Sequence, residues 1–300
     1  MPNINLDDAY ILDETGEQVD KVAGLFTKDE DTTSGEKAFA QLNIGTAGSN
    51  RNLLDNPWFT NPVNQRGAAS LPASAYGIDR WKGGSTGSVS VTSSGLVFGS
   101  RGGNAWQPVE SALRTWGSGK VFTASVRLSD GTVYSGSGTM GSGTTNFLST
   151  PIELFMSSAG NFNIRASSAY TIVAVKLELG TVSTLANDAP PDYGEELAKC
   201  QYHFRRIKNT GGSNRWLLSG FMATASTGVF HLQNQMRDAG ATISYSGTLL
   251  LNGGTVTSVT AYNDAGWTTI HVGTSASFTA FGGAGLVIGP GGYIDISRDI

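Results

Sequence analysis

The sequence predicts an all-β protein: two β-sandwich domains joined by a short helix and preceded by a partly helical N-terminal segment. Forty glycines and a charged content of only 15% go with apolar residues that recur in short runs between turn residues. Three hundred residues also exceed the usual size of one domain. We therefore expect four parts, at residues 1–50, 51–190, 191–208 and 209–300.

The N-terminal segment, residues 1–50, is chemically distinct from the rest. It carries ten acidic residues against three lysines, whereas the remaining 250 residues hold 17 basic and 14 acidic ones. Ser34 is placed to cap a short helix that contains Ala38, Phe39 and Leu42 and ends at Gly45. Because so short a helix is unstable alone, this segment needs copies of itself or another partner.

The first β-domain, residues 51–190, is predicted from alternating apolar positions. "VFTASVRL" (121–128) places Phe122 and every second residue after it on one face. "YTIVAVKLELG" (170–180) puts Val173, Val175, Leu177 and Leu179 on one face, with Lys176 and Glu178 on the other. The glycine-rich stretch 135–146 between them is interpreted as a mobile loop.

Residues 191–208 are predicted to form the linking helix. Pro190 and Pro191 block its extension backwards, and Asp192 is placed to cap it with Glu195 three residues on. Leu197, Cys200, Phe204 and Ile207 supply an apolar face. Beyond it, short strands about ten residues apart predict a second small sandwich over 209–300.

Two stretches of the chain match catalytic or cofactor-binding sequence motifs, and we interpret both matches as chance. "GGSTG" (83–87) matches a hydrolase elbow, but no helix is predicted after it, and "GSGTMG" (136–141) lacks the βαβ unit of a dinucleotide site. His203, His231 and His271 are too far apart for a ligand run. Cys200 is expected to be a buried hydrophobic residue. We expect no catalytic residues, no metal and no cofactor, although oxygens near Asp55 and Asn56 leave a calcium site open.

Aromatic side chains are the more informative group. Sugar rings stack on Trp and Tyr while polar neighbours bond the hydroxyls, so exposed tryptophans on a β-scaffold favour glycan binding. Trp81 is expected in the core. Four tryptophans in turn-rich polar contexts are the candidate ligand contacts: Trp106, Trp116, Trp216 and Trp267.

Several classes of partner are disfavoured. No basic cluster interleaved with aromatic residues tracks a groove, which argues against nucleic acid. No apolar stretch approaches about 18 residues, and "MPNINLDDAY" lacks the features of a signal peptide. We expect neither membrane insertion nor secretion by a signal peptide, and synthesis in the cytoplasm.

Six stretches, in this order, resemble a module of phage and prophage tail fibres and related minor virion proteins. They are "FTKDEDTTSGEKAFAQLNIGTAG" (26–48), "NLLDNPWFTNPVNQRG" (52–67), "YGIDRW" (76–81), "VKLELGTVSTLA" (175–186) running into "PPDYGEELAKCQYHFRR" (190–206), "QMRDAGATISYSG" (235–247) and "GYIDISRDI" (292–300). The resemblance implies that a carbohydrate-binding-module-like jelly roll opens at residue 52 and that the strand around 175–180 closes it.

The resemblance further implies a homotrimeric virion protein whose N-terminal segment attaches to other virion proteins. The preferred hypothesis is a non-enzymatic tail-fibre or receptor-binding protein that binds host-surface glycans. Two alternatives remain: a head fibre or capsid decoration protein, and a glycan depolymerase.

Overall fold

The computed structural model describes residues 10–12, 18–21, 50–232, 242–264, 267–278 and 282–297. The chain divides into two compact units, Met1–Asn50 and Arg51–Ile300. In the first unit, β1 (Tyr10–Leu12) pairs antiparallel with β2 (Gln18–Lys21). The helix predicted near residues 34–41 lies outside the described residues.

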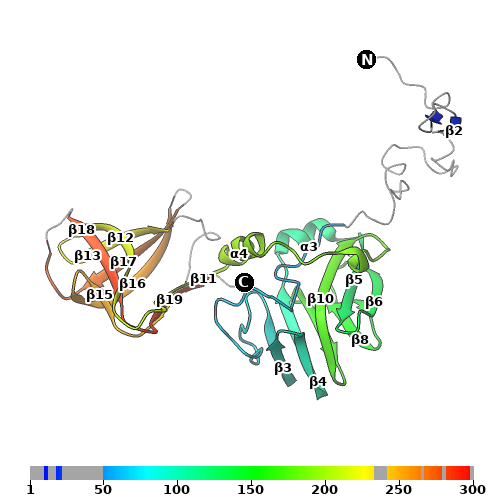
Figure 1. Cartoon of the computed structure of the whole chain (residues 1–300), viewed down its shortest axis with the longest axis horizontal. Helices are drawn as coiled ribbons and strands as arrows, with labels where there is room; N and C mark the ends of the chain where they lie inside the picture. Colours follow the sequence, from blue (N-terminus) through cyan, green and yellow to red (C-terminus); the bar gives the residue numbers. More distant parts are fainter. Residues whose placement is uncertain are drawn as a thin grey trace. The chain divides into compact units, whose positions relative to one another are not determined.

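The fold is mostly antiparallel β, as predicted, and residues 82–179 form one eight-stranded sheet (Figure 1). Seven of its strands are hydrogen-bonded in the order β6-β5-β10-β4-β9-β8-β7. The eighth, β3, pairs with β4 outside this series. The strands are β3 (Lys82–Thr92), β4 (Gly95–Pro108), β5 (Val121–Leu128), β6 (Val133–Thr139), β7 (Thr145–Leu148), β8 (Ile152–Met156), β9 (Asn161–Ala166) and β10 (Tyr170–Leu179). A short helix, α3 (Ser111–Gly117), follows β4.

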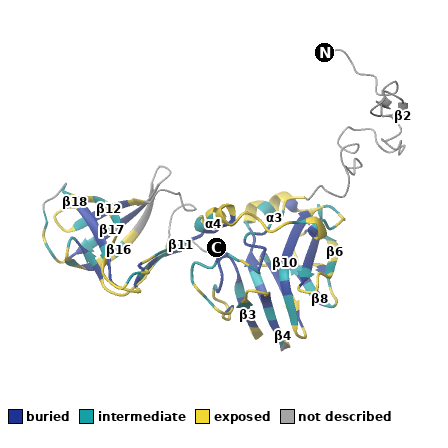
Figure 2. Cartoon of the chain, in the orientation of Figure 1, coloured by how far each residue is buried: buried dark blue, intermediate teal, exposed yellow. Residues whose placement is uncertain are grey.

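The long strand β4 lets this sheet curve around a single core. Its first part pairs with β10 through Leu96 to Phe98, and its last part pairs with β9 through Gly103 to Pro108. Gly102, between the two, has a φ of 75°, and a Cβ there would lie 2.0 Å from the Ala166 carbonyl oxygen. Figure 2 shows the buried residues along these strands. They include Leu96, Phe98, Phe122, Ala124, Val126, Leu154, Phe162, Ile164, Ile172 and Leu177.

Residues 121–128 form the predicted strand with Phe122, Ala124 and Val126 in the core, but Thr123 and Ser125 on its other face are buried as well, so the predicted half-buried strand is covered on both faces. The alternation predicted for 170–180 is also wrong in detail. Lys176 and Glu178 are buried, and Leu179 is exposed. The segment after β10 covers this face: Lys176 Nζ lies 2.8 Å from Asp188 Oδ2, and Glu178 Oε1 accepts the Thr184 N–H. The pattern separates these charged side chains from the apolar face but does not predict their burial, because their partners lie in a loop that periodicity cannot place.

The glycine-rich stretch 135–146 is not the predicted mobile loop, because β6 occupies its first half and β7 begins at Thr145. A Cβ on Gly136 would lie 2.0 Å from the Phe147 carbonyl oxygen. Glycine at this position therefore permits a close approach between strands, which composition alone does not distinguish from flexibility.

The opening segment, residues 52–59, is fixed by one buried side chain, Asn56. Its backbone φ is 51°, and its Nδ2 donates to the carbonyl oxygens of Val63 and Asp79 at 2.9 and 2.8 Å. Its Oδ1 accepts the Val63 N–H at 2.8 Å, and its carbonyl oxygen accepts from Trp81 Nε1 at 2.9 Å. Trp81 is buried, as predicted, and so are Leu54, Trp58 and Phe59.

Helix α4 (Tyr193–Gln201) begins as predicted, since the Asp192 side chain accepts the Glu195 N–H at 3.0 Å. It does not reach residue 208. Residues Phe204–Lys208 form strand β11, which pairs over its whole length with β19 (Tyr293–Ser297). The predicted extent of the helix was wrong because a distant strand and the Arg206–Asp295 ion pair, at 2.6 Å, hold this segment extended.

The second sandwich predicted over 209–300 is also corrected. Six strands close into a barrel in the order β12-β13-β17-β16-β15-β18. They are β12 (Arg215–Thr224), β13 (Thr227–Leu232), β15 (Leu249–Leu251), β16 (Gly254–Asp264), β17 (Trp267–Thr274) and β18 (Gly283–Ile288). β18 pairs with both β12 and β15, which closes the barrel and removes the open edges of a flat sheet. β14 (Thr242–Ser246) joins β19 and β11 in a separate three-stranded sheet.

In the part of the chain that the structure describes, every helix is too short or too polar to span a membrane.

Replacing Asn56 by Ala is expected to lower the free energy of unfolding by about 3 kcal/mol or more. The change leaves buried partners unpaired and keeps a β-carbon in the left-handed region without the local hydrogen bonds of Asn. Thermal unfolding should show a fall in Tm of about 6–12 °C. Asn214→Ala, at an exposed position, is the matched control and should change Tm little. Equal Tm values for the two variants would contradict this role of Asn56.

Cys200 is expected to resist alkylation in the folded protein. It is fully buried, and desolvation raises the pKa of its thiol, with Asp79, Asp55 and Glu196 raising that pKa further. The reactive thiolate is therefore scarce at pH 8. Mass spectrometry after iodoacetamide treatment should show labelling only once the chain is unfolded in guanidinium, and rapid labelling without denaturant would contradict the burial of this residue.

Candidate functional site

Trp106 lies in β4 on the face of the sheet that points away from the core. Its neighbour Ala105 belongs to the core, so the alternation of the strand turns the Trp106 indole outward. The indole is half-buried, and its Nε1 donates to the Gly83 carbonyl oxygen at 3.1 Å. This hydrogen bond fixes the ring against β3.

Strand register brings five further side chains into line with Trp106. Six residues, each paired with the next across adjacent strands or an isolated bridge, form what we call the aromatic row: Tyr76, Lys82, Trp106, Asn163, Phe155 and Asn146. Directly paired residues share a face of a sheet. The row therefore alternates aromatic rings with amide or ammonium groups on one outward-facing surface.

Partial exposure characterises the row. Tyr76, Lys82, Trp106 and Phe155 are half-buried and Asn146 is exposed, whereas Asn163 is largely buried and donates to the Asn161 carbonyl oxygen at 2.7 Å. The rings thus have one accessible portion and one portion packed against the scaffold. Such rings lose little freedom when a ligand stacks on them.

Cations flank the rings of the row. Lys82 Nζ lies 4.2 Å from the centre of the Tyr76 ring and 4.9 Å from that of Trp106. At the other end, the Arg165 guanidinium lies 4.9 Å from the Phe155 ring and forms an ion pair with Glu153 at 3.0 Å. These contacts orient the aromatic side chains.

An ion pair between partly exposed Arg66 and buried Asp79 holds the segment that leads into the row. Arg66 Nη1 lies 2.8 Å from Asp79 Oδ1, and the Arg66 guanidinium lies 4.9 Å from the Tyr76 ring. Burial raises the pKa of the Asp79 carboxyl, while hydrogen bonds from Gln65 and the charge of Arg66 lower it. The loop from Tyr76 to Trp81 is therefore anchored on both sides by polar contacts.

The other predicted tryptophans do not join Trp106. Trp116, in α3, is 50% exposed, meets Phe122 edge-on at 6.3 Å, and has Lys120 Nζ 3.6 Å from its ring centre. Trp216, in β12 of the barrel, is 67% exposed and lies across Gly285 of the neighbouring strand. Trp267 begins β17, and its side chain lies outside the described residues. Glycan contact by these three tryptophans stays a prediction.

Sequence reasoning named Trp106 but missed Lys82, Asn163, Phe155 and Asn146 as its neighbours. These residues come from four different strands, and only the pairing register places them together. The one available signal was that such residues alternate along the strand with apolar ones. Asn163 is followed by Ile164 and Phe155 is preceded by Leu154, and both of these apolar residues are buried.

The oxygens considered for calcium already have protein donors. Asp55 Oδ2 accepts from Arg80 Nε at 3.0 Å, and the Asp55 carbonyl oxygen accepts from Gln107 Nε2 at 2.7 Å. Asn56 Oδ1 accepts the Val63 N–H. Among the described residues, no group of three or more His, Cys, Asp or Glu is placed to hold a metal ion. The stretch 83–87 lies within β3 and leads into β4, which is not the strand-to-helix turn of a hydrolase.

Comparisons of this chain with protein-family models, curated proteins and solved structures find no match.

Proposed function

We propose that this protein binds glycans without cleaving them, through the aromatic row on the outward face of β3, β4, β9, β8 and β7. The observation that carries the proposal is the alternation of Tyr76, Trp106 and Phe155 with Lys82, Asn163 and Asn146 along a single line. A glycan presents apolar ring faces and hydroxyl groups in alternation, which rings and amides in alternation complement.

The length of the row suits a chain of sugars more than a single one. Adjacent strands lie about 4.8 Å apart, so six residues in line extend over about 24 Å. Several sugar units fit along this distance. Because the sheet holds each ring in place, the surface is preformed, and the entropy cost of ordering side chains on binding is small.

The finer assignment rests on the sequence resemblance to phage tail-fibre modules. We propose that residues 51–190 are a jelly-roll-like carbohydrate-binding module of a virion protein, a tail fibre or receptor-binding protein. Residues 1–50 attach to other virion proteins and assemble the chain into a homotrimer. Linking three weak glycan sites raises the avidity for a cell surface, which supports this arrangement.

Replacing Trp106 by Ala is expected to weaken glycan binding about fivefold or more, because one stacked ring contributes about 1 kcal/mol or more. The measurement is binding of the full chain to a glycan array and to intact bacteria, scored against Tyr245→Ala, an aromatic side chain of β14 that is 44% exposed and lies outside the row. Trp106→Phe should retain part of the affinity, and thermal melts should establish that each variant is folded.

Three outcomes contradict the proposal: no binding by the parent protein to any surface glycan, an equal loss in Trp106→Ala and Tyr245→Ala, or release of reducing ends from a bound polysaccharide. The last outcome favours a depolymerase.

Assembly is tested separately. Light scattering of the full chain should give about three times the 31.4 kDa mass of one chain, and removal of residues 1–50 should lower the mass to that of a monomer. A monomeric mass for the intact chain would contradict the proposed homotrimer but would not contradict the proposed glycan site.

A further inference from the structure

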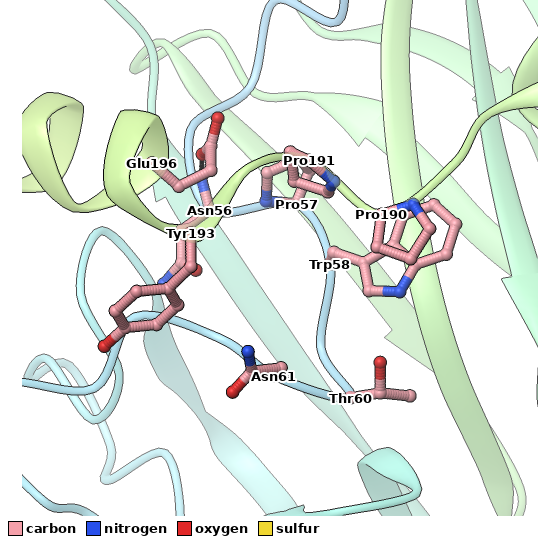
Figure 3. Close-up of a pocket in the computed structure, with 9 residues that line it drawn as sticks. All are labelled: Asn56, Pro57, Trp58, Thr60, Asn61, Pro190, Pro191, Tyr193 and Glu196. Atoms are coloured by element: carbon pink, nitrogen blue, oxygen red, sulfur yellow. Dashed lines mark hydrogen bonds between the residues drawn. The ribbon is translucent and has the colours of Figure 1, made fainter.

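A small pocket lies where the opening segment meets the start of α4. Its volume is about 150 Å³. In the view of Figure 3, Tyr193 and Trp58 stand on opposite sides of it, Pro190 lies over Trp58, and Asn61 and Thr60 lie below. Pockets that hold drug-sized ligands are usually larger, at about 300–1,000 Å³, so this one accommodates a single ring.

The walls of this pocket are rigid. Asn56 N–H donates to Glu196 Oε2 at 2.7 Å, which joins the opening segment to α4. The Phe59 N–H donates to the Val173 carbonyl oxygen at 2.7 Å, so the chain beside Trp58 is bonded to β10. Three of the lining residues are prolines, whose φ is fixed. The pocket is therefore formed before a ligand arrives.

The accessible groups are a phenol ring, an amide and a hydroxyl. Tyr193 is 45% exposed, Asn61 is exposed and Thr60 is half-buried. In the described part of the chain, the side chains of Thr60 and Asn61 make no hydrogen bond to protein. Both groups donate and accept, which is the pattern that sugar hydroxyls require.

Charge selects the class of ring. The nine lining residues, all of them described, include no Lys, Arg or His, and the one carboxylate, Glu196, already accepts from the Asn56 N–H and from Lys199. The ammonium of Lys199 is already paired with Glu196, so an anionic sugar would meet no unpaired cation among the lining residues or at that carboxylate. A neutral ring meets no such penalty.

We propose that this pocket binds one neutral pyranose, with its apolar face on Tyr193 and its hydroxyls on Asn61 and Thr60. The site is distinct from the aromatic row, because it takes a single ring from a terminal position or a branch and uses different residues. It does not depend on the row being a glycan site. A proline-rich peptide is the competing occupant, since such peptides also dock on aromatic side chains.

The test is titration of the full chain with methyl glycosides of glucose, galactose, mannose and N-acetylglucosamine, followed by NMR saturation transfer and calorimetry. Glucuronic acid and a proline-rich decapeptide serve as comparison ligands. At least one neutral glycoside should bind with saturation, and Tyr193→Ala and Asn61→Ala should each weaken it about tenfold. Tyr202→Ala is the matched control, because Tyr202 is 44% exposed, directly follows the same helix and does not line the pocket.

Trp106→Ala separates the two sites: it should leave binding of the monosaccharide unchanged even where binding of a glycan chain is lost. The proposal is overturned if no neutral glycoside saturates, if Tyr202→Ala weakens binding as much as Tyr193→Ala, if glucuronic acid binds more tightly than the neutral sugars, or if the peptide alone binds at Tyr193.

Discussion

The buried side chain of Asn56 is the constraint on which the two candidate surfaces depend. Its amide bonds Val63 and Asp79, and its backbone bonds Trp81 and Glu196. Asp79 and Trp81 stand between Tyr76 and Lys82, where the aromatic row begins, and the residues after Asn56 form one side of the small pocket. An amide that satisfies its donors and its acceptor inside the protein specifies one arrangement, because any shift leaves a buried polar group unpaired.

Buried charged side chains also fix the positions of loops, in a chain that has no disulfide. Arg80 has a positive φ of 70° and is held by Asp55 and the Pro108 carbonyl oxygen, while Lys176 lies between Asp188 and Glu178. Burying such groups is costly, and well-packed apolar residues often stabilise a fold as much. Their effect here is positional: each links a loop to a strand that is distant in sequence, so the loops that carry Tyr76 and Pro190 keep fixed places.

How far the sequence predicts this structure depends on the range of the interactions. Period-two patterning located residues 121–128 correctly, and local capping located the start of α4 at Asp192, since both follow from neighbours within a few residues. The strand at 204–208 and the closed barrel were misjudged because each is decided by a partner far along the chain. Lys176 was misjudged because its partners Thr184 and Asp188 lie in the loop after the strand, which periodicity cannot place. The aromatic row is the extreme case: Trp106 was chosen from its local context, but the residues beside it follow only from the register of β3, β9, β8 and β7.

Exposure alone is therefore a weak criterion for a glycan site. Trp216 is the most exposed tryptophan among the described side chains, yet it lies across Gly285 without a line of amides beside it. Trp106 shows less surface, but its indole is fixed to Gly83 and its cross-strand neighbours are an ammonium and an amide group. A sugar needs a ring face and hydrogen-bonding partners at the same time, and a fixed ring loses less entropy on stacking. A half-buried tryptophan in register with polar residues meets both requirements better than an exposed one alone.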